Sequence, residues 1–216
     1  MASVTVERLR TPRGELVLRR SGEHCEIVSN GVFLMDTRDG RSERELVRAA
    51  LGAAPPGARL LIGGLGVGFS LAEAVRSPGV ELVTVVEIEP AVVRWHRSHL
   101  ARWSADAMHD PRVEVVTADL GDWLRSAADR YDAICLDVDN GPEWTVTVDN
   151  EALYGKAGLD ALARRLVPDG TLAVWSSNAA AAFEALLRSR FATVHTRLVS
   201  VARGEPDVVY VARRPR

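Results

Sequence analysis

The fold is decided by the stretch Leu60-Leu61-Ile62-Gly63-Gly64-Leu65-Gly66-Val67-Gly68 and by the later run Val83-Thr84-Val85-Val86-Glu87. An apolar run ends in glycines, a helix-like segment follows, and the second apolar run ends in a carboxylate. Glycines let the backbone approach a ligand closely, and a carboxylate at the next strand end can accept hydrogen bonds from a ribose diol. This order of elements predicts a nucleoside-binding α/β unit.

Strand-like and helix-like segments alternate after this stretch, which predicts a parallel sheet with helices on both faces. We expect strands at 59–62, 82–87, 113–117, 133–136 and 171–175, and helices at about 68–76, 119–126, 151–166 and 179–188. Pro90 favours the first turn of a further helix. Ala192–Val199 and Asp207–Ala212 predict an antiparallel pair at the sheet edge.

The N-terminal part of the chain has a different pattern. Residues 14–40 are typical of short strands, and Asn30-Gly31 between two of them is a strong hairpin signal. Ser42-Glu43-Arg44-Glu45 has the form of a capping box and predicts a helix that starts there. Because Ala53-Ala54-Pro55-Pro56-Gly57 breaks the pattern, we divide the chain into a small N-terminal β region with its linking helix, 1–54, and a Rossmann-like domain, 55–216.

Composition excludes several classes of function. The 216 residues are 47% hydrophobic and 26% charged, as in ordinary soluble enzymes, and the net charge of −2 argues against nucleic-acid binding. No apolar run reaches the roughly 20 residues that a membrane span needs, and the amino terminus lacks the form of a signal peptide. We therefore expect a cytoplasmic protein. Cys25 and Cys135 are expected to be buried free thiols, and His96 and His99 lack partners at metal-ligand spacing.

Ligand-competent groups follow four consecutive predicted strands. In open α/β sheets the ligand lies across the carboxyl ends of the strands, so these groups should meet on one rim. They are Gly63, Gly64, Gly66 and Gly68 after the first strand, Glu87 after the second, Asp119 after the third and Asp137 after the fourth. This combination is more specific than any single motif.

Each carboxylate also has a plain structural alternative. Glu87 can hold the ribose hydroxyls or be a solvated strand-end acid, and Glu89 could take its place. Asp119 can accept a hydrogen bond from an adenine amino group, cap the following helix, or do both.

The loop after the fourth strand carries the candidate catalytic and acceptor groups. Asp137 follows an apolar run and can take a proton from a nucleophile or hold a cationic substrate; the alternative is that it only caps and hydrates the loop. Asp139 and Glu143 lie close by in the sequence and favour a site role. Trp144 can pack over a substrate or a sulfonium, with a surface or subunit contact as the alternative.

Four runs together carry a family likeness: Leu60 to Glu87, Asp-Pro-Arg-Val-Glu-Val-Val at 110–116 with Asp119, Tyr131-Asp132-Ala133-Ile134 leading into Asp137, and Gly141-Pro142. They resemble the spermidine synthases, which are aminopropyltransferases on the class I S-adenosylmethionine methyltransferase fold. The likeness spans about residues 31 to 176. It implies a Rossmann-like α/β sheet of seven strands whose last pair is antiparallel, after a small N-terminal β region. It also implies ribose contact by Glu87, adenine contact by Asp119 and a catalytic base at Asp137.

The chain departs from the family pattern at three places. Gly66 stands where the family has the aspartate that binds the amine of decarboxylated S-adenosylmethionine. The loop Asp137–Pro142 is shorter, so Asp139 only approximately replaces the family's second aspartate. The Tyr-His-Glu of the linking helix has no counterpart in Glu45–Ala49.

We therefore expect a transferase that binds S-adenosylmethionine or its decarboxylated form, without a metal, and passes an aminopropyl or methyl group to a small acceptor such as an amine. Glu143, Trp144 and Asp139 are the expected acceptor contacts. The alternatives are a small-molecule methyltransferase and a non-catalytic nucleoside-binding partner subunit. A dinucleotide-dependent oxidoreductase is disfavoured, because the glycines fit Gly-x-Gly-x-Gly rather than Gly-x-Gly-x-x-Gly. We expect a homodimer.

Overall fold

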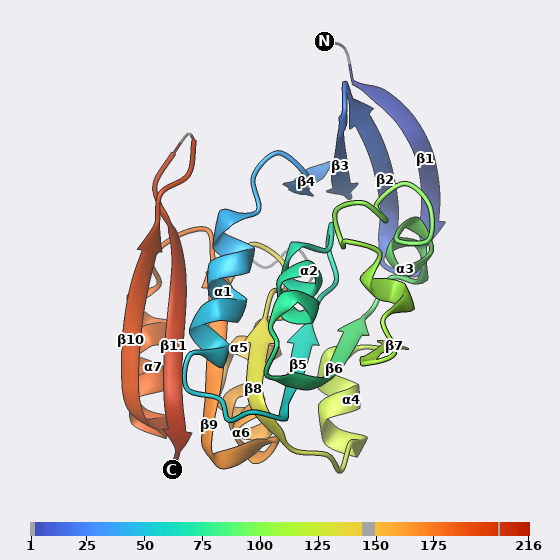
Figure 1. Ribbon diagram of the computed structural model, residues 1–216. Helices are drawn as coiled ribbons and strands as arrows, with labels where there is room; N and C mark the ends of the chain where they lie inside the picture. The colour runs from blue at the N-terminus through green and yellow to red at the C-terminus, as the bar shows by residue number, and fades with distance from the viewer. Residues whose placement is uncertain (1–2, 144–149, 203) are drawn as a thin grey trace.

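The protein contains two β-sheets, as seen in a computed structural model that describes residues 3–143, 150–202 and 204–216 (Figure 1). The first sheet has four strands in the order β1-β2-β3-β4, and the second has seven in the order β10-β11-β9-β8-β5-β6-β7. The last two strands of the chain pair antiparallel to each other. The predicted fold class is therefore confirmed.

The four-stranded sheet is an antiparallel meander of β1 Val4–Thr11, β2 Gly14–Ser21, β3 His24–Ser29 and β4 Val32–Asp36. Sequence analysis did not predict β1. The turn at Asn30-Gly31 joins β3 to β4 with φ of 51° and 80°, which is the left-handed geometry that the Asn-Gly signal predicts.

The linking helix α1 spans Arg41–Leu51, as expected. The prediction of a capping box at its start is wrong. The N-cap residue is Gly40, and its helix has no side-chain cap. The Ser42 hydroxyl instead donates to the Glu43 carboxylate at 3.1 Å. The helix packs on α2, β8 and β9 of the larger unit, so its first turn faces the rim of the seven-stranded sheet. The division of the chain at residue 54 stays a prediction.

The strands of the large sheet are β5 Ala58–Gly63, β6 Val80–Glu87, β7 Val113–Thr117, β8 Tyr131–Leu136, β9 Leu166–Ser176, β10 Phe191–Val199 and β11 Asp207–Pro215. The helices between them are α2 Phe69–Arg76, α3 Pro90–Trp95, α4 Leu120–Ser126, α5 Glu151–Tyr154, α6 Lys156–Arg164 and α7 Ala181–Arg190, with a 3₁₀ turn at Ala107–His109. The helix expected over 151–166 is interrupted, because Gly155 adopts an extended conformation between α5 and α6. Strand β9 begins at Leu166 rather than Thr171.

Two apolar layers sandwich the sheet. Along β5, Leu60 and Ile62 point to the layer shared with α1 and α2, while Leu61 points to the layer shared with α4, α6 and α7. This alternation follows from the period of two along a strand. Figure 1 shows α1 and α2 in front of the sheet and α7 behind it. Cys25 and Cys135 are both buried and free, as predicted.

The carboxyl ends of β5, β6 and β8 form a rim beneath the N-terminal sheet (Figure 1). Arg13, in the turn between β1 and β2, reaches this rim: its Nε donates to Glu89 at 2.8 Å and its Nη2 to the Ile88 carbonyl at 2.9 Å. Within the described residues, no helix has the length and apolar character that crossing a membrane requires.

Candidate active site

A cavity of about 1090 Å³ lies at this rim and is lined from both sheets and from α1. It brings together six of the predicted site residues: Gly64, Gly66, Glu87, Asp119, Asp137 and Asp139. Gly63, Gly68 and Glu143 are not part of its lining, and Glu143 is exposed. Trp144 lies outside the described residues.

At both lining glycines, Gly64 and Gly66, φ is positive and a Cβ atom would collide with a neighbouring residue. Gly64 has φ of +91°, and a Cβ there would lie 2.1 Å from the Asp137 carbonyl oxygen. Gly66 has φ of +49°, and a Cβ there would lie 2.3 Å from the Met35 sulfur. The first contact brings two strand-end loops together. The second places a thioether from β4 directly against the glycine loop.

Gly63 and Gly68 have packing roles on the two sides of the loop. A Cβ at Gly63 would lie 2.5 Å from Leu120 Cδ2, so this glycine lets α4 approach β5. A Cβ at Gly68 would lie 2.6 Å from the His96 ring, and Gly68 is the left-handed N-cap of α2. Their direct contact with a ligand stays a prediction.

Glu87 is fixed in place by backbone groups. Its Oε2 accepts from the Leu65 N–H at 2.9 Å and its Oε1 from the Glu89 N–H at 2.7 Å. Burial raises the pKa of the Glu87 carboxyl, and these hydrogen bonds act in the opposite direction. A carboxylate can accept about four hydrogen bonds, so Glu87 can still accept one from a ligand hydroxyl.

Glu89 also lines the cavity but has a different set of partners. Its Oε1 accepts from Thr11 and from Arg13, while its Oε2 is buried without a hydrogen-bond partner among the described residues. Glu89 thus ties the N-terminal sheet to the rim. The alternative that it replaces Glu87 at a ribose stays open.

Asp119 is the N-cap of α4, since its side chain accepts from the Asp122 N–H at 2.8 Å. It also lines the cavity. The capping role is confirmed, and the adenine contact stays a prediction that the same side chain can fulfil with its other oxygen.

Asp137 lies at the end of β8, where Ser70 of α2 donates to its Oδ2 at 2.9 Å. Burial raises the pKa of this carboxyl to about 6, a value that suits a proton acceptor near neutral pH. The next residues form a tight loop, in which Asp139 has φ of 53° and accepts from Asn150 at 2.7 Å. Sequence analysis did not find Ser70, whose contact depends on the packing of α2 on the neighbouring strands β5 and β6.

Two further carboxyl groups at the cavity were also missed. Glu43, in the first turn of α1, is 7% exposed, and Asp207 begins β11. Burial, followed by the charge of Asp137, raises the pKa of Glu43 to about 8. Burial also raises the pKa of Asp207. Glu43 lies at the start of the helix that leads to the rim, and this position could have indicated a site role. Sequence analysis instead included Glu43 in the predicted capping box.

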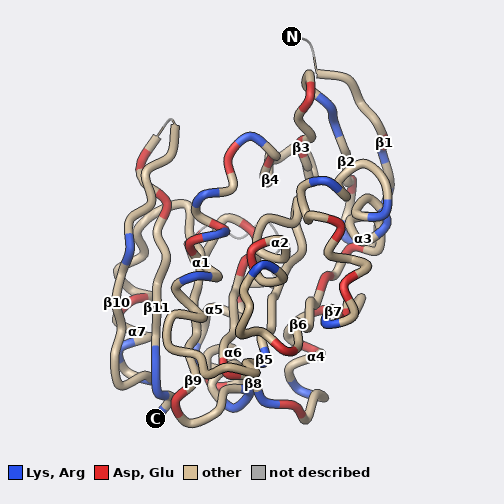
Figure 2. The backbone as a smooth tube through the Cα atoms, viewed as in Figure 1, with Lys and Arg blue, Asp and Glu red and all other residues tan. Residues whose placement is uncertain are grey.

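Glu43, Asp137 and Asp207 lie at the cavity without an ion pair among the described residues, although the charge of Arg41 acts on Asp207. Figure 2 shows acidic and basic residues alternating along the connection from β4 into α1, where Asp36 pairs with Arg38 and Asp39 with Arg41. By contrast, no ion pair of the described chain includes Glu43, Asp137 or Asp207. The cavity therefore contains a cluster of three carboxyl groups that form no ion pair within the described chain.

Comparison with known proteins identifies the family. Residues 42–194 match the spermine/spermidine synthase domain. The chain belongs to this family. The domain covers the glycine loop, Glu87, Asp119 and Asp137, but neither the N-terminal sheet nor Asp207.

Curated proteins of similar sequence are polyamine aminopropyltransferases by name. The chain is 36% identical over 140 residues to polyamine aminopropyltransferase 1 of Streptomyces coelicolor, covering 64% of this chain and 25% of that protein. It is 34% identical over 166 residues to the polyamine aminopropyltransferase of Mycobacterium tuberculosis, covering 74% of this chain and 30% of that protein. The chain thus matches less than a third of the length of these relatives.

Solved structures share the fold at low sequence identity. A spermidine synthase in complex with the transition-state analogue AdoDATO superposes with a TM-score of 0.82 at 17% identity, over 97% of this chain and 73% of that chain. Human methyltransferase-like protein 13 in complex with SAH superposes with a TM-score of 0.64 at 19% identity, over 81% of this chain and 83% of that chain. Within the residues that the structure describes, no group of three or more His, Cys, Asp or Glu could hold a metal ion.

Proposed function

We propose that this protein is an aminopropyltransferase that uses decarboxylated S-adenosylmethionine as donor and a cationic amine as acceptor. One observation carries the proposal. A single cavity joins the glycine loop and Glu87, which suit a nucleoside, to Glu43, Asp137 and Asp207, three carboxyl groups that form no ion pair in the described chain and suit an ammonium group. Membership of the spermine/spermidine synthase family supports the same chemistry.

The donor half of the cavity would hold the nucleoside. Glu87 would accept hydrogen bonds from the ribose hydroxyls, and Asp119 from the adenine amino group. The loop around Gly64 and Gly66 would admit the rest of the donor, because neither residue has a side chain that projects into the space.

The acceptor half would attract and deprotonate the amine. Glu43 and Asp207 would favour a positive charge, and Asp137 would take the proton from the attacking nitrogen. The new carbon–nitrogen bond forms as the carbon–sulfur bond breaks, so the sulfonium becomes a neutral thioether, methylthioadenosine. The protein contributes alignment and exclusion of water, because the sulfonium is already an activated leaving group.

Methyl transfer from S-adenosylmethionine is the second candidate. It is favoured by the position of Met35, whose sulfur fills the space beside Gly66. The family has an aspartate for the donor amine at the position of Gly66, whereas in this chain the Met35 side chain lies where a Cβ of residue 66 would be. A donor whose tail is recognised differently would be compatible with this arrangement.

Calorimetric titration of the purified protein tests the proposal. We expect methylthioadenosine and decarboxylated S-adenosylmethionine to bind, and Glu87→Gln to weaken both. Asp169→Asn is the control, because Asp169 is an exposed acid far from the cavity lining. Binding of S-adenosylhomocysteine in preference to methylthioadenosine would favour methyl transfer. Binding of NAD alone would refute both candidates.

A further inference from the structure

Three consecutive residues of the glycine loop are held by side chains from three different elements. The Leu65 N–H donates to Glu87 Oε2 at 2.9 Å. The Gly66 carbonyl accepts from His96 Nε2 at 2.9 Å, and the Val67 N–H donates to the Met35 sulfur at 3.2 Å. Sequence analysis considered His96 only as a metal ligand and did not single out Met35.

The last two contacts act on one peptide group. The Gly66 carbonyl and the Val67 N–H belong to the same planar amide and point in opposite directions. His96 therefore holds one end of this amide and Met35 the other. A peptide next to a glycine can rotate easily, since glycine accepts both signs of φ. The two side chains together oppose that rotation.

Burying His96 beside the glycine loop leaves one of its ring nitrogens without a hydrogen bond to any described residue. His96 follows α3 directly, it is 0% exposed, and it is not part of the cavity lining. A carbonyl can only accept, so Nε2 has the proton and Nδ1 does not. Nδ1 is buried without a partner among the described residues, and burial lowers the pKa of the imidazole to about 4. An uncompensated buried polar atom calls for a compensating role.

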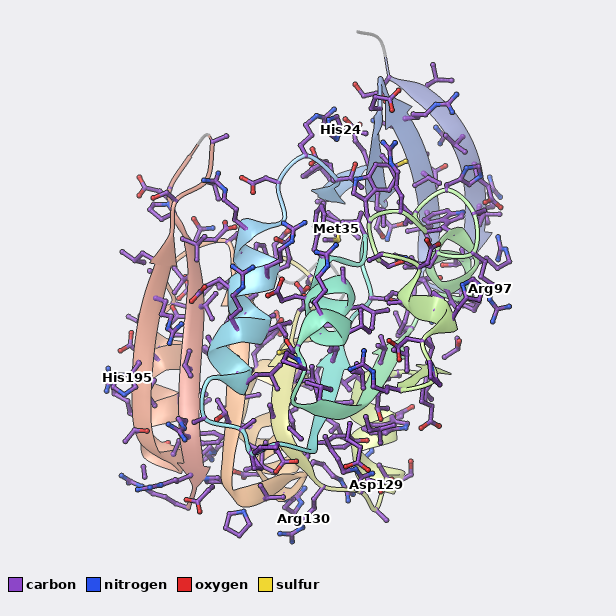
Figure 3. All side chains as sticks on the ribbon, viewed as in Figure 1. His24, Met35, Arg97, Asp129, Arg130 and His195 are labelled. Carbon is purple, nitrogen blue, oxygen red and sulfur yellow. The ribbon has the colours of Figure 1, made fainter. Side chains whose placement is uncertain are left out.

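Met35 brings the N-terminal sheet into the same arrangement. It lies on β4, and Figure 3 labels its side chain between that sheet and the start of α2. The Met35 sulfur also occupies the volume in which a Cβ at Gly66 would lie. The N-terminal sheet thus contacts the loop itself and not only the outer edge of the rim.

We propose that His96 is a positioning residue of the donor site: with Met35 it clamps the Gly66–Val67 peptide, so that the glycine loop is preformed before a nucleoside binds. The Gly66 carbonyl is held toward His96 and away from the cavity. A loop fixed in advance does not pay the cost of ordering on binding, which is the general benefit of preorganisation. This inference rests on the proposed donor site.

The test replaces His96 with two amide side chains, glutamine and asparagine, that differ in length by one methylene group. His96→Gln can place an amide N–H close to the position of Nε2, whereas His96→Asn places it at the position of Nδ1, too far from the Gly66 carbonyl. We expect H96N to bind methylthioadenosine about tenfold more weakly than wild type, and H96Q to stay within about threefold. His99→Asn is the matched control, because His99 is exposed in the same segment.

A second readout needs no ligand. Amide hydrogen exchange at Val67 in the unliganded protein should accelerate in H96N and in Met35→Leu, and much less in H96Q. Equal exchange at Val67 in H96N, H96Q and wild type would overturn the clamp. Equal weakening of binding in H96N and H96Q would overturn the role of the Nε2 hydrogen bond. If wild type binds no nucleoside while exchange at Val67 follows the expected order, the clamp holds and the proposed donor function fails.

Discussion

Glu43 offers a quantitative test of the buried carboxyl groups at the acceptor half. Its carboxyl group is 7% exposed, and its side-chain partner is the hydroxyl of Ser42. Burial raises its pKa from an ordinary 4.5 to about 8. The folded protein therefore holds this proton more tightly than the unfolded chain does, and the free energy of unfolding falls as pH rises between these values.

The magnitude follows from the same pKa values. The wild-type protein should lose about 4 kcal/mol of this contribution between pH 5 and pH 9. Glu43→Gln removes the titrating group, so the free energy of unfolding of E43Q relative to wild type should rise by about that amount over the same range. Because the charge of Asp137 also raises the pKa of Glu43, the same comparison between E43Q/D137N and D137N separates the contribution of burial from that of Asp137.

Urea unfolding at a series of pH values measures this difference. Glu45→Gln is the matched control, because Glu45 lies on the same helix and forms an ion pair with Arg197 at the surface. Its curve should run parallel to that of wild type. Adding 1,4-diaminobutane should narrow the gap between E43Q and wild type above pH 8, since an ammonium group favours the ionised carboxylate. Parallel curves for E43Q and wild type across the whole range would refute the raised pKa of the buried Glu43.

Three further predictions concern the rest of the site. Asp137→Asn should lower turnover by about 10² to 10⁴-fold while the dissociation constant of methylthioadenosine stays within about threefold; a parallel loss of nucleoside binding would show that Asp137 does not act as a base. Gly64→Ala should destabilise the protein by about 3 kcal/mol or more, because the new Cβ would lie 2.1 Å from a backbone oxygen, whereas Gly204→Ala, with φ of +94° and open space, should cost about 1 kcal/mol in thermal unfolding. Glu87→Gln should weaken methylthioadenosine binding about tenfold or more by calorimetry, since it removes the charge that strengthens both ribose hydrogen bonds; unchanged affinity in E87Q, with a loss in Glu89→Gln, would move the ribose contact to Glu89.

Local sequence patterns were sufficient to predict the strands that form the rim of the sheet. The apolar runs that end at Gly63, Glu87 and Asp137 predicted β5, β6 and β8, because strand ends are marked by the residues themselves. The rule that ligands lie across carboxyl ends then placed these groups at one cavity before any contact was known. The resemblance to the spermidine synthases agrees with the same positions.

The missed features depend on contacts between distant parts of the chain. Strand β1 alternates weakly and gains its pairing from β2. Glu43 and Asp207 are separated by most of the Rossmann-like domain, and no local signal shows that both reach the cavity. Ser42 illustrates the opposite error, since a correct local motif predicted a capping box where the Gly40 cap and the Ser42–Glu43 hydrogen bond are found. The expected homodimer stays a prediction.

The central claim is that the protein transfers an aminopropyl group from a sulfonium nucleoside to a cationic amine within one cavity. Its most direct test incubates the purified protein with decarboxylated S-adenosylmethionine and 1,4-diaminobutane, and follows both products by mass spectrometry. We predict that methylthioadenosine and the aminopropylated amine appear in equal amounts, and that both form about 10² to 10⁴-fold more slowly with D137N. Methylthioadenosine without an alkylated amine, or equal product formation in D137N, would contradict the account.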